Sequence, residues 1–270
     1  MYLHIGLGRA GSTYLQRKIF PNFNGIKFLS SSNSKTFEKE RINFFYNPLF
    51  IPKKKFSGEK LLVSTVTFFH SKTSIAKLIN EINLFSEKPI IIIILRNPID
   101  HLISTYKNLV KTGNLWMSIE DQFNFNDTYR SQLIQPNMIF DKSLYEYDKL
   151  IKELKKKFRV KIFIFEKIFE NYTSMRKFID NLSEIFQTKY NKNFKIEDFN
   201  PINQSTYSDI EIKEKRIENF KLNNAKIYDK LKIKEDYFNK IYSKKFLIKF
   251  KKIFLKKNKI YFSNLGNRNI

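Results

Sequence analysis

Short runs of apolar residues recur along the chain, each about as long as a buried strand. They cover residues 2–7, 26–29, 61–65, 90–95 and 160–165. The stretches between these runs are long enough for crossover helices, and strands buried on both faces are apolar throughout. This alternation predicts an α/β fold with a central, mostly parallel sheet of about five strands.

The pattern changes near the C-terminus to lysine-rich segments with helical periodicity. We therefore expect an α/β domain over residues 1–207 and a basic, mainly helical extension over residues 208–270 that packs on the same domain. Residues 246–255 read FLIKFKKIFL, with an apolar side and a lysine side. We favour a helix that packs its apolar side on the domain and leaves its lysines in water. Weak association with an anionic membrane or glycan is the alternative.

The composition narrows the classes of partner and chemistry. The 270 residues carry a formal charge of +24, which attracts anions of any kind. The charge therefore indicates a negatively charged partner but does not identify its chemical class. The chain has no cysteine, so disulfides, thiolate metal sites and cysteine nucleophiles are excluded. With only three histidines, a metal site is not expected either.

The apolar runs are also too short to cross a membrane. The longest, residues 90–95, is far below the roughly 20 residues that a spanning helix needs. The first residues form a strand pattern and lack the charged region and cleavage site of a signal peptide. We therefore expect a soluble, cytoplasmic protein.

A glycine-rich segment follows the first apolar run directly. Residues 6–13 read GLGRAGST, which predicts a strand, a tight turn and the start of a helix. Free backbone N–H groups converge at such a turn and bind an anion, with phosphate as the natural occupant.

Two nucleotide-binding patterns match this segment incompletely. Gly6, Gly8 and Gly11 spell GxGxxG, but residues 28–32 read FLSSS and supply no acid for a ribose, and the large Arg9 would obstruct a pyrophosphate. The Walker A pattern requires a lysine where Ser12 stands.

A third pattern fits completely. The residues RAGST resemble the 5′-phosphosulfate-binding loop of sulfotransferases that use 3′-phosphoadenosine-5′-phosphosulfate (PAPS), with the pattern [K/R]-x-G-[S/T]-[S/T]. This resemblance implies a P-loop-like three-layer fold, PAPS as cosubstrate and no metal. It also implies that the 5′ end of the donor is bound by Arg9, Ala10, Gly11, Ser12 and Thr13.

The chemistry explains the cation in this loop. The leaving group is a nucleotide 5′-phosphate, so negative charge grows on the bridging oxygen, where a cation and backbone donors stabilise it. Arginine keeps its proton, so Arg9 can stabilise charge as a catalytic group but cannot act as a general acid.

A second motif follows the fourth apolar run. Arg96 comes directly after it, Pro98 is a good first helical residue, and residues 112–113 give a plausible end. The apolar positions of this helix form one stripe, and His101 and Ser104 fall on the other side. Helical side chains lean toward the N-terminus, so Ser104 leans toward Arg96. An arginine followed eight residues later by a serine resembles the 3′-phosphate-binding element of sulfotransferases.

Residues 160–171 also resemble a strand and a following acidic element of these enzymes, so the resemblance covers about residues 1–207. Many relatives place a glutamate or histidine after the third strand as general base, but Val66 stands at the acid's position here. His70 is the nearest titratable group and our first candidate for the base, and His101 is the second.

The resemblance implies that the chain moves a sulfuryl group from PAPS to a hydroxyl or amine of a carbohydrate, lipid or small metabolite and releases PAP. Two alternatives remain open. One is an NAD(P)-dependent oxidoreductase that uses Gly6, Gly8 and Gly11, and the other is a non-catalytic polyanion-binding protein that uses the lysines. Nucleic acid is not an expected partner, because no recognisable binding module is present. The residues do not identify the acceptor.

Overall fold

The computed structural model describes residues 1–30, 60–65, 75–86, 88–113, 115–120, 145–191, 199, 208–223 and 244–257. The chain divides into two compact units. The first contains Met1–Asn97 and Tyr147–Asn203, and the second contains Pro98–Glu146 and Gln204–Ile270. The domain division into residues 1–207 and 208–270 stays a prediction, because compactness alone does not identify a part that folds by itself.

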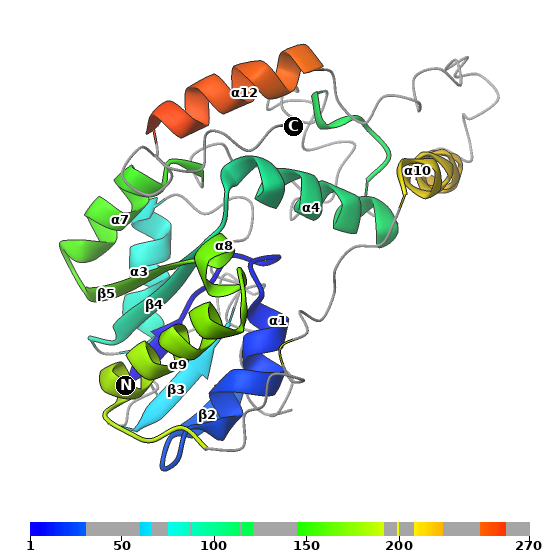
Figure 1. Cartoon of the computed structure of the whole chain (residues 1–270). Coiled ribbons are helices and arrows are strands. Elements are labelled where there is room, and N and C mark those ends of the chain that lie inside the picture. The colour runs from blue at the N-terminus through cyan, green and yellow to red at the C-terminus, as the bar shows by residue number, and fades with distance from the viewer. Residues whose placement is uncertain are drawn as a thin grey trace. The chain divides into compact units, whose positions relative to one another are not determined.

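A five-stranded, all-parallel sheet forms the core of the first unit (Figure 1). Its spatial order is β2-β3-β1-β4-β5. The strands are β1 (Tyr2–His4), β2 (Lys27–Ser30), β3 (Leu61–Ser64), β4 (Ile90–Leu95) and β5 (Arg159–Ile164). Each predicted apolar run overlaps one of these strands, so the α/β class and the parallel sheet are confirmed.

The burial of the central strand β1 accounts for its run of apolar residues. In β1, Leu3 lies opposite Val63 of β3 and Ile91 of β4, and all three side chains are fully buried. A parallel strand in the middle of a sheet is covered on both faces, so its residues are apolar without alternation.

Helices cover the sheet of the first unit, with α9 in front of it and α3 behind it in Figure 1. The helical segments of this unit are α1 (Ser12–Tyr14), η1 (Leu15–Ile19), η2 (Phe20–Asn22), α3 (Ile75–Phe85), α7 (Tyr147–Lys155), α8 (Phe165–Ile168) and α9 (Tyr172–Phe186). Helix α9 begins at an N-cap, where Asn171 Oδ1 accepts the N–H of Ser174 at 2.9 Å. Its buried stripe includes Met175, Phe178 and Leu182, at the spacing of one helix face.

The second unit contains α4 (Pro98–Lys111), α10 (Asp209–Asn223) and α12 (Lys244–Lys257). Helix α4 begins at Pro98 and is followed by Gly113 with φ 77°, as its start and stop signals predict. One expectation for this helix is wrong. His101 does not lie on an exposed side but is 8% exposed, because Tyr145 covers it and its Nδ1 lies 3.2 Å from the Tyr145 hydroxyl oxygen.

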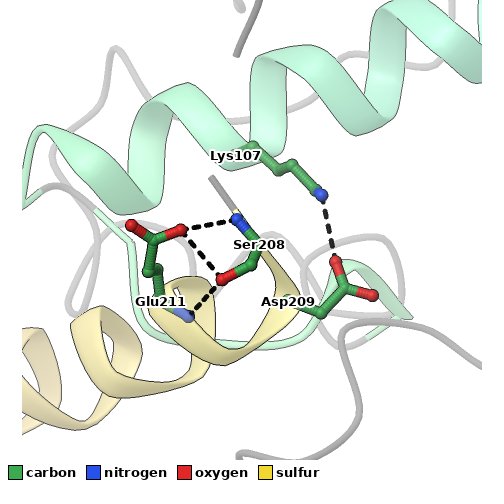
Figure 2. Close-up of polar contacts among 4 residues, drawn as sticks. All are labelled: Lys107, Ser208, Asp209 and Glu211. Carbon is green, nitrogen blue, oxygen red and sulfur yellow. Dashed lines mark hydrogen bonds and ion pairs between the residues drawn. The ribbon is translucent and has the colours of Figure 1, made fainter. Parts of the chain in front are cut away.

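Helix α10 begins with a capping box that the periodicity did not reveal (Figure 2). Glu211 Oε2 accepts the N–H of Ser208 at 2.7 Å and its hydroxyl at 2.8 Å, and Ser208 Oγ accepts the N–H of Glu211 at 3.2 Å.

Helix α10 also contacts other segments of the second unit. Lys107 of α4 pairs with Asp209 at 3.0 Å. Further along α10, the fully buried Arg216 donates from Nε to the carbonyl of Trp116 at 2.9 Å. These contacts fasten α10 to α4 and the segment after it.

Helix α12 buries part of its apolar side within the second unit, whereas Ile248 is 57% exposed. Packing of this stretch on the α/β domain stays a prediction. Leu247 and Phe250 are buried, and the Phe250 ring lies 5.9 Å from that of Tyr145. Lys245, Lys249 and Lys252 are exposed. In the described part of the chain, no helix has the length and apolar character needed to cross a membrane.

Candidate functional site

The loop after β1 is a tight turn with two residues in the left-handed region. Arg9 has φ 64° and Gly11 has φ 75°, and the N–H of Ala10 donates to the carbonyl of Leu7 at 3.3 Å. A left-handed conformation costs a residue with a Cβ about 1–2 kcal/mol. Arg9 adopts it nevertheless, and backbone strain of this kind is concentrated at functional sites.

Gly11 is required for packing as well as for conformation. A Cβ on Gly11 would lie 2.6 Å from the Phe169 ring and 3.2 Å from the Phe165 ring, both of which belong to the segment after β5. The two rings pack together with centroids 4.7 Å apart. The loop therefore rests on an aromatic pair that only a glycine can approach.

Arg96, at the end of β4, lies against the same loop. Its Nη1 donates to the carbonyl oxygen of Arg9 at 2.6 Å, and its guanidinium carbon lies 4.7 Å from the centre of the Phe165 ring. A guanidinium over an aromatic face gains cation–π attraction. Arg96 is thus held in place by the backbone of one neighbour and the ring of another.

The two arginines bring their positive charges together. Burial lowers the pKa of the Arg9 guanidinium below its usual range, and the charge of Arg96 lowers it further. Both groups stay protonated at neutral pH, because arginine does not lose its proton in proteins. The two neighbouring guanidinium groups would attract an anion that carries more than one negative charge.

The backbone after β4 is fixed by two side chains from elsewhere in the first unit. Glu166 Oε1 accepts the N–H of Asn97 at 2.8 Å, and the Tyr147 hydroxyl donates to the carbonyl of Arg96 at 3.1 Å. These bonds fix the backbone of Arg96 and Asn97 and thereby orient the Arg96 side chain.

The other predicted donor-binding residues of the loop lie beside Arg9. Ala10 is fully buried and Thr13 is half-buried. Ser12 is 5% exposed, and its hydroxyl donates back to the carbonyl of Leu7 at 3.2 Å, so it braces the turn.

The remaining predicted residues belong to the second unit or lie outside the described residues. Ser104 is half-buried on α4 in the second unit, and its pairing with Arg96 stays a prediction. His101 belongs to that unit too. His70 lies outside the described residues. In the described segments, no three His, Asp or Glu side chains form a group that could hold a metal ion.

Sequence reasoning missed the residues that support the two arginines. Phe165, Glu166 and Phe169 were recognised only as part of the similar element at residues 160–171, and Tyr147 was not selected as a site residue. The three residues after the fifth strand could have been selected, because the carboxyl end of that strand must lie at the same edge as that of β4.

The strand order differs from those of two well-known nucleotide-binding sheets. Classical dinucleotide-binding folds have the order 3-2-1-4-5-6, and flavodoxin-like folds have 2-1-3-4-5. The present order places β3 between β1 and β2 and matches neither.

No protein-family model matches the chain. No curated protein matches it either. Among solved structures, the chain is similar to the crystal structure of a sulfotransferase from Alicyclobacillus acidocaldarius, with a TM-score of 0.50 and 14% identity, over 88% of this chain and 98% of that one. The chain has a sulfotransferase-like fold. At this identity the likeness concerns the fold and does not extend to substrates.

Proposed function

We propose that the chain is a sulfotransferase that moves a sulfuryl group from PAPS to an acceptor hydroxyl or amine and releases PAP. The observation that carries this proposal is the pair of arginines at the loop after β1, where Arg96 Nη1 donates to the Arg9 carbonyl at 2.6 Å. A doubly cationic site suits a nucleotide donor with several phosphate and sulfate charges. The sulfotransferase-like fold supports the same conclusion.

The reaction assigns a role to each side chain. The bond from sulfur to the 5′-phosphate oxygen breaks as the acceptor oxygen or nitrogen bonds to sulfur, and the acceptor proton passes to a base. Arg9 stabilises the charge that grows on the 5′-phosphate oxygen, together with backbone N–H groups of residues 11–13. His70 is the proposed base and His101 the second candidate.

Arg96 is proposed to bind the 3′-phosphate, with Ser104 as its partner. The ring of Phe165 lies against the guanidinium, and the Arg9 carbonyl accepts a bond from its Nη1, so the group is held at the loop. A planar guanidinium matches the geometry of a phosphate.

The test compares the binding of PAP and 5′-AMP by calorimetry. PAP should bind at least about tenfold more tightly, because charge-assisted hydrogen bonds to the 3′-phosphate contribute roughly 1.5–3 kcal/mol. Arg96→Ala should remove most of this preference. Arg159→Ala is the matched control, because Arg159 is exposed at the opposite, amino end of β5. Equal affinity of the parent protein for both nucleotides would overturn the proposal.

The NAD(P) alternative finds no support in the strand order. Since β3 separates β2 from β1, the end of β2 lies two strand spacings, about 10 Å, from the strand that carries the glycine loop. A ribose-binding acid at the end of the second strand would have to bridge that distance.

A further inference from the structure

A buried polar network lies beneath the loop and contains a histidine that the proposed mechanism does not use. His4 Nδ1 lies 2.7 Å from Ser64 Oγ, and Gln16 Nε2 donates to the same oxygen at 2.9 Å. Gln16 also reaches the Ser64 carbonyl at 3.4 Å. His4 precedes the loop in β1, Gln16 follows it in η1, and Ser64 belongs to the neighbouring strand β3. The network therefore ties both flanks of the loop to a third segment.

Gln16 donates to Ser64 Oγ, and a serine oxygen can accept two bonds or accept one and donate one. The contact between Ser64 Oγ and His4 Nδ1 therefore fits either neutral tautomer of the imidazole. In the part of the chain that the structure describes, Nε2 is buried and has no hydrogen-bond partner.

The imidazole also forms part of the floor of the loop. A Cβ on Gly6 would lie 2.5 Å from His4 Nε2 and 3.1 Å from Ser12 Oγ. Gly6 does not have a positive φ, so the close approach of the imidazole, and not the backbone conformation, requires a glycine here. A Cβ on Gly8 would have no atom within 4 Å. An alanine at position 8 would therefore meet no neighbour, whereas one at position 6 would collide with the imidazole.

His4 has no access to a bound acceptor. Its side chain is 0% exposed and its ring packs edge-on against Phe20, with centroids 5.1 Å apart. Burial lowers its pKa from 6.5 to about 3, so the ring is neutral at physiological pH. A group in this position acts through the loop and not on the reacting atoms.

We propose that His4 is a positioning residue for the donor-binding loop. Its ring supports the loop at Gly6, and through Ser64 it fixes Gln16 on the far flank, so that Arg9 is presented in its left-handed turn. The ligand of the loop is taken from the proposed function, but the support of the loop by His4 is a property of the protein without nucleotide.

The test uses two substitutions of His4 and two measurements. His4→Phe keeps a ring against Phe20 and removes both nitrogens, whereas His4→Asn keeps a polar group near the position of Nδ1. Hydrogen exchange of peptides that cover residues 5–16 reports on the loop, with α9 as internal reference. Calorimetry with PAP reports on the site.

We expect His4→Phe to accelerate exchange in residues 5–16, with α9 unchanged, and to weaken PAP binding about tenfold, as for loss of a buried hydrogen bond. His4→Asn should recover part of both. Wild-type exchange and affinity in His4→Phe would overturn the proposal. If the parent protein binds no PAP, the proposed function fails, while the exchange measurement still decides the role of His4.

Two further variants cover the case in which His4→Phe does not fold. Gln16→Leu approximately keeps the side-chain volume and removes both bonds from Gln16 to Ser64 while His4 stays in place, so it should accelerate exchange in the same peptides. Gly6→Ala should do so too, with Gly8→Ala as the matched control that does not. Histidine-selective ¹⁵N spectra give a direct signature, because the chain has only three histidines. The His4 resonances should show a neutral ring at pH 7, and a charged imidazolium would contradict the network.

Discussion

Lowering the pH should destabilise the protein through His4. The buried imidazole has its pKa lowered from 6.5 to about 3, so between these values the unfolded chain binds a proton that the folded chain does not. Unfolding is then coupled to proton uptake, and stability rises with pH in this window. The contribution is fully present above pH 6.5 and is lost as the pH falls toward 3.

The magnitude follows from the two pKa values. When the unfolded chain binds one proton more than the folded chain, the free energy of unfolding changes by about 1.4 kcal/mol per pH unit. This slope holds well inside the window between the two pKa values. Between pH 7 and pH 5 the loss from His4 alone amounts to about 2 kcal/mol, which is a large part of the stability of an ordinary domain.

The assay is urea denaturation followed by circular dichroism at pH 7, 6 and 5, for the parent protein and for His4→Asn. The variant should be less stable at pH 7 but should lose about 2 kcal/mol less than the parent between pH 7 and 5. Phe178→Leu is the control, because it weakens a buried position on α9 without changing a titratable group. Its pH dependence should match that of the parent. Parallel pH profiles for His4→Asn and the parent would refute the reasoning.

Substitutions at three other positions test the loop and the second unit. Arg9→Ala should lower kcat about a hundredfold or more in steady-state assays with PAPS while PAP still binds, and Arg9→Lys should recover part; an unchanged kcat contradicts the role of Arg9. In urea denaturation, Gly11→Ala should cost about 1–3 kcal/mol more than Gly25→Ala, because both glycines have positive φ but only Gly11 meets an aromatic ring; equal costs contradict the packing. Ser208→Ala should cost about 1 kcal/mol in urea denaturation at pH 7 through loss of the helix cap. The Ser208 N–H and, to a lesser degree, its hydroxyl lower the pKa of the Glu211 carboxyl; the variant loses only the hydroxyl, so its cost should be smaller in acid, below the usual glutamate pKa, and an equal or larger cost there contradicts this.

The positions of the strands and of the two arginines were predictable from local patterns. Five apolar runs became five strands, and β4 has the predicted limits, residues 90–95. The ends of parallel strands share one edge of a sheet, so residues directly after β1 and β4 had to lie at the same edge. Arg9 and Arg96 could therefore be selected without knowledge of the strand order.

The outer side of α4 was predicted less well. A helical wheel assigns His101 to the polar side, but the structure buries it under Tyr145, which lies outside the helix. A wheel describes one helix in isolation and carries no information about which distant segment covers its polar side.

The sequence by itself determined the elements, the glycine turn and the cations that follow two of the strands, because these depend on residues within one strand or one helical turn of each other. The tertiary structure decided what supports those cations. The bond from Arg96 to Arg9 joins residues 87 positions apart, and the bond from His4 to Ser64 spans 60. Such contacts depend on the order β2-β3-β1-β4-β5, which makes β3 and β4 the neighbours of β1. Apolar periodicity specifies which residues are buried in a strand but not which strands are adjacent, so the partners of His4, Gly11 and Arg96 emerged only from the packed sheet.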